Sequence, residues 1–185
     1  MTGVLAQKIT AGEFLEREDF EEGFFYELIE GEIVKKQAPS PQHQLAVVKI
    51  LVRLDAFVTE RNLGKCLCAP VDVFLDEWNY YQPDILFIGN ERLSIITPDG
   101  VQGAPDLVVE VLSPSSIRND RTDKMRAYRR HGVREYWIAD PKSRTVEIYS
   151  LVEGEYEMSD VAAESGPVRS RLLDGLTVEL AVIFG

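Results

Sequence analysis

One stretch of the sequence, residues 105–133, constrains the fold more than any other. It begins PDLVVEVL, a run of Leu and Val that is typical of a buried strand, yet it carries Asp106 and Glu110. Side chains alternate along a strand, so both carboxylates are expected on one face. Carboxylates on a central strand are costly unless they are solvated, paired or bound to metal. The stretch therefore predicts a core strand that carries acidic groups to a site.

A basic segment follows this strand. Residues 118–134 hold seven Lys and Arg side chains against two Asp, a local charge of +5 in a chain whose net charge is −11. The acidic remainder argues against a protein that binds nucleic acid over its whole surface. The spacing predicts a helix over about 118–131, in which Lys124 shares a row with Asp120 and Tyr128 and turns toward the sheet.

Two interpretations of Lys124 stay open at this point. A lysine carried toward the end of the preceding strand could orient a water molecule and stabilise charge that develops on a phosphate. The more common arrangement is a solvated Asp120–Lys124 pair, with the lysine stem lying along apolar surface.

Asp84 is a third carboxylate of the same kind. It follows Pro83 and begins the strand sequence ILFI, which is apolar throughout. If this strand is a neighbour of the first, Asp84 and Glu110 can converge on one divalent cation, Mg²⁺ with Mn²⁺ as a substitute. Alternatively, Asp84 caps its strand and Glu110 pairs with a helix arginine, and the spacing alone favours neither.

The remaining elements predict one α+β domain over residues 1–185. Thr10 and Glu13 form a capping-box pattern for a helix to about Glu18, and FFYELIEGEIVKKQ is typical of a β-hairpin with its turn at Glu30-Gly31. Ser40-Pro41 begins a second helix, in which apolar residues recur at helical spacing. These are Leu45, Val48, Leu51, Val52 and Val58.

After Gly64 the pattern changes to strands, interrupted by a Gly- and Pro-rich loop over 89–104 and completed by a tail with a hairpin and the apolar stretch LTVELAVIF. No apolar run is long enough for a membrane helix and no signal peptide is evident, so a cytoplasmic location is expected. Cys66 and Cys68 are expected to be buried free thiols.

The ordered motifs YELIEGEIV, SPQHQ, QPDILFI, APDLVVEVLSPSS, HGVREYWIADP and TVEIY resemble the Uma-two family of putative restriction endonucleases, from about residue 10 to the C-terminus. That family belongs to the PD-(D/E)xK nuclease superfamily. The resemblance implies a restriction-endonuclease-like α+β fold, with a central mixed β-sheet flanked by helices and an N-terminal β-hairpin. It also implies a Mg²⁺-dependent endonuclease that hydrolyses phosphodiester bonds of DNA.

The resemblance assigns roles to individual residues. Asp84 and Glu110 match the metal-binding carboxylates of the two half-motifs. The lysine expected two residues after Glu110 is replaced by Leu112, and Lys124 on the next helix is the matching position. Asp106 and Glu27 are further catalytic candidates, and His43 is the weakest assignment. The catalytic set is therefore Asp84, Glu110, Lys124, Glu27 and Asp106.

Two other functions compete with the nuclease. One is a catalytically inactive nucleic-acid-binding or scaffold protein on the same fold. The other is a glycosidase that uses a carboxylate pair, although no aromatic-lined cleft is evident. A homodimer is expected because such nucleases place two sites around a two-fold axis, with Trp78, Tyr80 and Tyr81 as contact candidates.

Overall fold

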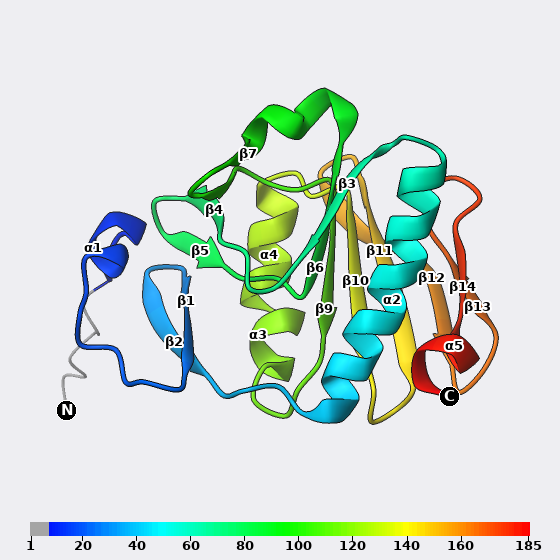
Figure 1. The fold of residues 1–185 in the computed structure, drawn as a ribbon, viewed down its shortest axis with the longest axis horizontal. Coiled ribbons are helices and arrows are strands. Elements are labelled where there is room, and N and C mark those ends of the chain that lie inside the picture. The colour runs from blue at the N-terminus through cyan, green and yellow to red at the C-terminus, as the bar shows by residue number, and fades with distance from the viewer. Residues whose placement is uncertain (1–7) are drawn as a thin grey trace.

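A computed structural model of the protein describes residues 8–185. Its main sheet has the strand order β12-β11-β10-β9-β6-β3, in which β9 and β10 are parallel and the other neighbours are antiparallel (Figure 1). The strands are β3 (Gly64–Cys68), β6 (Ile85–Gly89), β9 (Leu107–Val111), β10 (Glu135–Asp140), β11 (Thr145–Val152) and β12 (Glu155–Ala163).

A second sheet, the hairpin sheet, lies toward the N-terminal side and has the order β2-β1-β5-β4-β8-β7. Its strands are β1 (Phe25–Ile29), β2 (Glu32–Lys36), β4 (Val73–Asp76), β5 (Asn79–Tyr81), β7 (Ile96–Thr97) and β8 (Gly100–Gln102). Glu30 and Gly31 connect β1 to β2 with positive φ angles of 50° and 80°, as a tight hairpin turn requires. The predicted N-terminal hairpin and its turn are confirmed.

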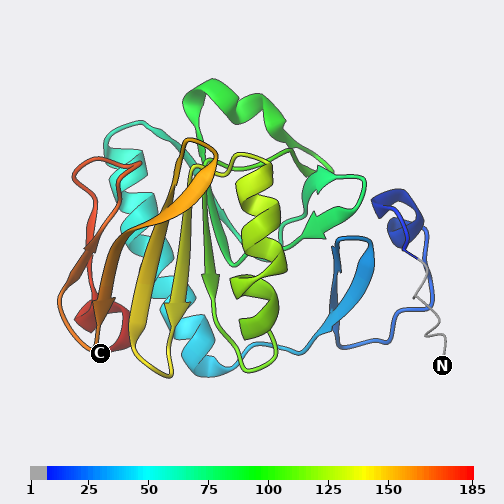
Figure 2. The same cartoon turned by 180° about the vertical axis from the view of Figure 1, so that it is seen from behind.

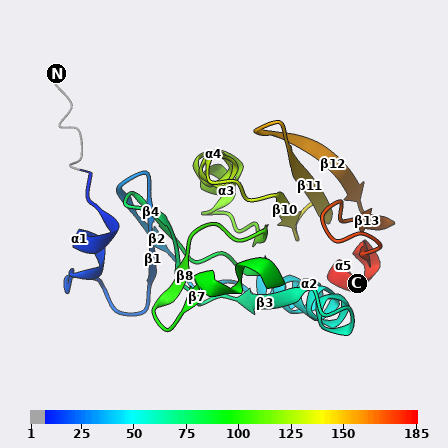
Figure 3. The same ribbon diagram turned by 90° about the horizontal axis from the view of Figure 1, so that it is seen from above.

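Helices cover both faces of the main sheet. Seen from above, α2 and α5 lie on one side of it and α3 and α4 on the other (Figure 3). The view from behind shows α3 and α4 across the sheet, between its strands and the hairpin sheet (Figure 2). The helices are α1 (Ala11–Leu15), α2 (Pro41–Glu60), α3 (Ile117–Arg121), α4 (Asp123–Arg130) and α5 (Leu180–Phe184), with a 3₁₀ turn η1 (Asn90–Ile95) and a small hairpin of β13 (Pro167–Arg169) and β14 (Thr177–Glu179).

Alternation along β9 divides the core in two. Leu107 and Val109 pack with the α2 face, whereas Val108 packs with Tyr128 and Tyr136 on the α4 face. Glu110 lies on the same strand face as Val108 and therefore points toward α4. The sheet flanked by helices confirms the predicted fold class. The alternation along β9 also places the carboxylate of Glu110 beneath α4.

Several predicted elements differ in detail. The expected helix over 118–131 is interrupted at Thr122, whose φ and ψ of −126° and −84° are not helical, and it forms α3 and α4. The first helix has the capping box at Thr10 but ends at Leu15 rather than Glu18. The loop over 89–104 contains η1, β7 and β8. The apolar stretch LTVELAVIF, for which no element was predicted, forms β14 and α5.

The second helix forms as predicted, but of its five expected apolar residues only Val58 is buried and Leu51 is partly buried. Leu45, Val48 and Val52 are 60%, 50% and 59% exposed, whereas its buried apolar residues include Ala46, Ile50 and Leu54. Both sets recur at helical spacing, so periodicity predicts the helix without choosing its inner face.

Two further expectations need correction. Tyr80 and Tyr81 are buried within the chain, so they are not available as dimer contacts, and only Trp78 of that group is partly exposed. Both cysteines are free as expected, but Cys66 is partly buried and Cys68 is exposed because β3 lies at the edge of the main sheet. Within residues 8–185, no helix has both the length and the apolar character needed to cross a membrane.

Candidate active site

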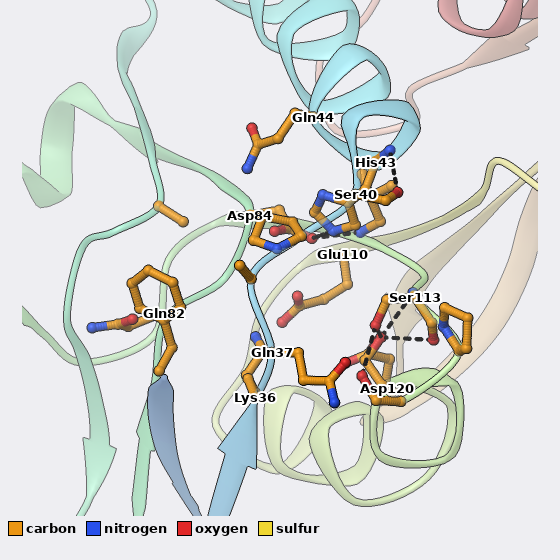
Figure 4. Close-up of a pocket in the computed structure, with 18 of the residues that line it drawn as sticks. Lys36, Gln37, Ser40, His43, Gln44, Gln82, Asp84, Glu110, Ser113 and Asp120 are labelled. Atoms are coloured by element: carbon orange, nitrogen blue, oxygen red, sulfur yellow. Dashed lines mark hydrogen bonds and ion pairs between the residues drawn. The ribbon is translucent and has the colours of Figure 1, made fainter. Parts of the chain in front are cut away.

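A cavity of about 320 Å³ lies where the hairpin sheet, the start of α2 and the loop after β9 meet (Figure 4). Asp84, Glu110 and Asp120 contribute carboxyl groups to its lining, and Lys36 and His43 contribute basic groups. These residues come from β2, α2, β9, α3 and the position that immediately precedes β6. The cavity therefore gathers titratable side chains from five separate segments.

Asp84 is positioned by the neighbouring strand. The backbone N–H of Val111 donates a hydrogen bond of 2.7 Å to Asp84 Oδ2, and His43 Nε2 lies 3.3 Å from the same oxygen. Within residues 8–185, Asp84 Oδ1 accepts no hydrogen bond. Burial lowers the pKa of His43, but the Asp84 carboxylate outweighs this effect and the pKa is raised.

Glu110 is held by α4. Lys124 Nζ and the Tyr128 hydroxyl each donate a hydrogen bond of 2.9 Å to Glu110 Oε1. Lys124 and Tyr128 are one helical turn apart, so both reach the same strand residue. Glu110 Oε2 accepts no hydrogen bond from the described residues, and the side chain lines the cavity.

Lys124 links three carboxylates that lie far apart in the sequence. Its Nζ is 2.9 Å from both Glu27 Oε1 and Glu110 Oε1, and 3.6 Å from Asp120 Oδ1. The side chain is 1% exposed, which rules out a solvated Asp120–Lys124 pair. Lys124 is not part of the cavity lining and stands behind Glu110.

Glu27 is fixed on the hairpin sheet by two further groups. The backbone N–H of Gln82 donates to Glu27 Oε1 at 3.0 Å, and Lys36 Nζ is 3.2 Å from the same oxygen. Burial raises the pKa of Glu27, but Lys124 and Lys36 outweigh it and hold the pKa below its usual value. Glu27 therefore stays ionised.

At Glu110 and Asp120, nearby positive charge does not offset the effect of burial on the carboxyl pKa. Burial raises the pKa of Glu110 to about 8, even though Lys124 opposes this shift, and burial also raises the pKa of Asp120. Lys124 keeps its charge, because the attraction of Glu110 and Glu27 exceeds the effect of burial and raises its pKa well above the usual value. When Glu110 is ionised, the negative charge around it therefore exceeds what the lysines offset.

This excess matches what a divalent cation supplies. Four carboxylates against two lysine ammonium groups leave a formal charge of −2 when all are ionised and His43 is neutral. The groups are Glu27, Asp84, Glu110, Asp120, Lys36 and Lys124. Among residues 8–185, no group of three or more acidic, His or Cys side chains is arranged to hold an ion. Mg²⁺ is commonly held by one or two carboxylates with water and phosphate, so Asp84 and Glu110 fit it.

Asp106 is not brought into this site. Its Oδ1 is 3.0 Å from Arg92 Nη1, and its Oδ2 accepts from the backbone N–H of Gly89. It precedes β9, four residues before Glu110, which corresponds to about 13 Å along an extended strand. The structure therefore separates Asp106 from the other four predicted catalytic residues.

The basic segment after β9 presents little free charge. Arg121 pairs with Glu147, Arg129 with Glu155, and Arg130 with Glu30 and Asp76. Arg126 pairs with Asp123, and Arg134 lies 3.9 Å from Asp106. Within residues 8–185, Arg118 is the one member of the segment without a carboxylate within 4.0 Å. The segment is mostly an ion-pair network rather than a surface for phosphate.

Sequence reasoning missed Lys36 and Gln82 as members of the site. Lys36 is the last residue of β2 and lies directly opposite Phe25 of β1. Phe25 is two residues before Glu27 on the same strand. The hairpin register, once the Glu30-Gly31 turn is placed, is the signal that could have identified it. Gln82 acts through its backbone N–H, which leaves no signal in the side-chain pattern.

Comparisons with known proteins identify a family and a similar fold. The profile of the family described as "Uma2: Putative restriction endonuclease" matches residues 11–182. The fold is similar to a solved structure described as a putative nuclease belonging to DUF820 from Anabaena variabilis. The TM-score is 0.77 at 23% identity, over 95% of this chain and 97% of the other. None of the curated proteins matches the chain.

Proposed function

The chain belongs to the Uma2 family of putative restriction endonucleases, and from this membership we propose that it is a Mg²⁺-dependent nuclease that hydrolyses phosphodiester bonds of DNA. The observation that carries the proposal is the pairing of a buried Lys124 with Glu110, whose other carboxylate oxygen is left open to a cavity that Asp84 also lines. Ordinary core carboxylates are satisfied on both oxygens.

Asp84 and Glu110 are the proposed metal ligands. Each has one oxygen fixed by the protein, by Val111 N–H and by Lys124 respectively, and one oxygen without a hydrogen-bond partner among residues 8–185. The hydrogen bond to one carboxylate oxygen orients the side chain and leaves the other oxygen available to a cation. A divalent cation bound there supplies a charge that neutralises phosphate and lowers the pKa of a bound water.

Lys124 has a positioning role in this proposal. Its ammonium group is buried behind Glu110 and touches Glu27, so it acts on the carboxylates rather than on substrate directly. By stabilising the ionised forms of Glu27 and Glu110, it keeps the site negative enough to attract a cation. Glu27 in turn fixes the lysine from the hairpin sheet.

Two groups in the lining are placed to act on a phosphate or a leaving group. Lys36 offers an ammonium group at the cavity, and His43 is a proton donor whose raised pKa keeps it partly protonated near neutral pH. Proton transfer by a positioned His is a common contribution to hydrolysis. These roles are proposed from position and charge.

The direct test is cleavage of supercoiled plasmid and of circular single-stranded DNA by the purified protein, with Mg²⁺, with Mn²⁺ and with chelator. We expect cleavage with either cation, no cleavage with chelator, and loss of cleavage in Glu110→Gln. Glu135→Gln, which changes a buried carboxylate outside the cavity, is the matched control and should remain active. If the wild-type protein cleaves neither DNA with either cation, the proposal fails and the scaffold function replaces it.

A homodimer remains part of the proposal. Two copies would place two sites around a two-fold axis. Because Tyr80 and Tyr81 are buried, the contact would have to use other residues, and the exposed apolar side chains Leu45, Val48 and Val52 on α2 are better candidates. Light scattering that gives the mass of one chain at micromolar concentration would rule the dimer out.

A further inference from the structure

Part of the cavity lining is not used by the proposed chemistry. Phe25, Gln37 and Gln44 face the cavity with Lys36, although none of the first three carries a charge or transfers a proton efficiently. We propose that these residues form a subsite for one unstacked nucleotide of single-stranded DNA, with its base against Phe25 and its phosphate toward Lys36. The inference rests on the proposed function, because the nucleotide is the one next to the cleaved bond.

Phe25 is an exposed aromatic ring in a specific place. It is 46% exposed and lines the cavity, and it begins the strand that carries Glu27. Residues i and i+2 share a strand face and lie about 7 Å apart, so one face of β1 leads from the ring at the rim to the buried carboxylate. An aromatic side chain at this position is available to stack on a nucleobase, which contributes substantial affinity for any base.

Lys36 lies directly opposite Phe25 in the hairpin register, so the two side chains share one face. Its side chain is 26% exposed, and its ammonium group is 3.2 Å from Glu27. A cation beside an aromatic ring, both open to one cavity, matches the two ends of a nucleotide. The hairpin therefore presents a base-binding and a phosphate-binding group as one rigid pair.

Gln37 and Gln44 add polar groups to this subsite. Figure 4 shows both amides at the cavity, one following β2 and the other in the first turns of α2. Within residues 8–185, neither amide has a hydrogen-bond partner, so both their donors and their acceptors are available. Each amide can pair with the edge of a base, which presents donors and acceptors of its own.

The same observations argue against an intact duplex as the preferred substrate. Duplex binding needs many phosphate contacts, but the arginines of α3 and α4 are mostly paired with carboxylates. Lys36 and His43 are the basic side chains of the lining. In addition, the faces of bases in a duplex are covered by stacking, so Phe25 can reach only a base that has left the stack.

The test measures binding apart from cleavage. Fluorescence anisotropy of a short labelled oligothymidylate and of a labelled hairpin duplex of equal length would be recorded with Ca²⁺ in place of Mg²⁺. We expect the single strand to bind more tightly than the duplex. Phe25→Ala should weaken single-strand binding by about 10–100-fold, the range expected for loss of one stacked base, and Phe25→Trp should restore it.

Phe24→Ala is the matched control, because Phe24 is the adjacent aromatic residue, does not line the cavity and instead lies beneath Lys35. It should leave the affinity for the single strand unchanged. Circular dichroism melting would verify that both alanine variants fold. Duplex binding as tight as single-strand binding, or equal affinity of Phe25→Ala and wild type for the single strand, overturns the inference.

The outcomes separate this inference from the proposed function. Cleavage of duplex DNA that Phe25→Ala does not reduce would retain the nuclease and remove the subsite. Conversely, single-strand binding that depends on Phe25, without cleavage by wild type under Mg²⁺ or Mn²⁺, would retain the subsite in a protein that binds DNA without hydrolysing it.

Discussion

Glu110 and Glu135 are buried carboxylates on neighbouring parallel strands, exposed by 2% and 0%, yet their surroundings differ completely. Glu135 Oε1 accepts hydrogen bonds from Trp137 Nε1 and the Ser170 hydroxyl, and its Oε2 accepts from the backbone N–H groups of Arg171 and Leu172. Both oxygens are satisfied, and the carboxylate fastens the C-terminal segment to the sheet.

Glu110 has one oxygen bonded to Lys124 and Tyr128 and one oxygen open to the cavity, and other carboxylates lie nearby. The comparison shows that burial of a carboxylate does not by itself identify a site. What distinguishes Glu110 from Glu135 is its position at the cavity, where one oxygen has no hydrogen-bond partner and nearby carboxylates leave a surplus of negative charge when ionised, both of which a cation relieves.

The largest expected effect is on catalysis. Glu110→Gln keeps the size of the side chain but removes the charge that holds a cation, so hydrolysis should fall by about 10⁴-fold or more. Calorimetry with Mn²⁺ should show weaker binding, and Asp84→Asn should behave in the same way. Full metal affinity in either variant would place the metal elsewhere.

Removal of Lys124 should affect stability as well as function. Lys124→Met leaves Glu27 and Glu110 buried without their shared cation, a change that typically costs about 3–5 kcal/mol. Urea unfolding would measure this loss, and metal affinity should fall because more of Glu110 becomes protonated. A stability equal to that of wild type would mean that the buried ion pairs contribute little.

Glu135→Gln tests the other carboxylate. One of its oxygens becomes an N–H₂ group facing donors, so we expect a loss of about 2–3 kcal/mol in unfolding free energy. Metal binding and hydrolysis should be retained, since Glu135 lies outside the cavity lining. Reduced metal affinity in the folded variant would contradict the distinction between the two carboxylates.

The raised pKa of Glu110 predicts a pH dependence of stability. The folded-state pKa, about 8, exceeds that of the unfolded chain, so the folded state binds the extra proton between the two values. Stability is therefore expected to decrease as pH rises from about 4.5 toward 8, at roughly 1 kcal/mol per pH unit or less. Glu110→Gln should flatten this decrease in thermal melts across that range. The same slope in both proteins would show that other groups cause it.

The smallest effect is expected at Asp106. Its partner Arg92 is 39% exposed, so Asp106→Asn should lower stability by about 1 kcal/mol and leave hydrolysis unchanged. A large loss of hydrolysis in the folded variant would return Asp106 to the catalytic set.

Local patterns in the sequence were sufficient for much of the fold. The Glu30-Gly31 turn, the Ser40-Pro41 helix start and the apolar strand around Glu110 depend on neighbouring residues, and all three are present. The motifs around Asp84 and Glu110 likewise identified carboxylates that the structure brings to one cavity. Their roles in catalysis stay predictions.

Other properties were decided by tertiary structure alone. Alternation placed Asp106 and Glu110 on one strand face, but only the packing puts Glu110 beneath Lys124 and leaves Asp106 with Arg92. Lys124 reaches Glu27 across 97 positions of sequence. Periodicity describes which way a side chain points along its own element. It carries no information on which element covers that face, because register and packing between distant segments determine the partner.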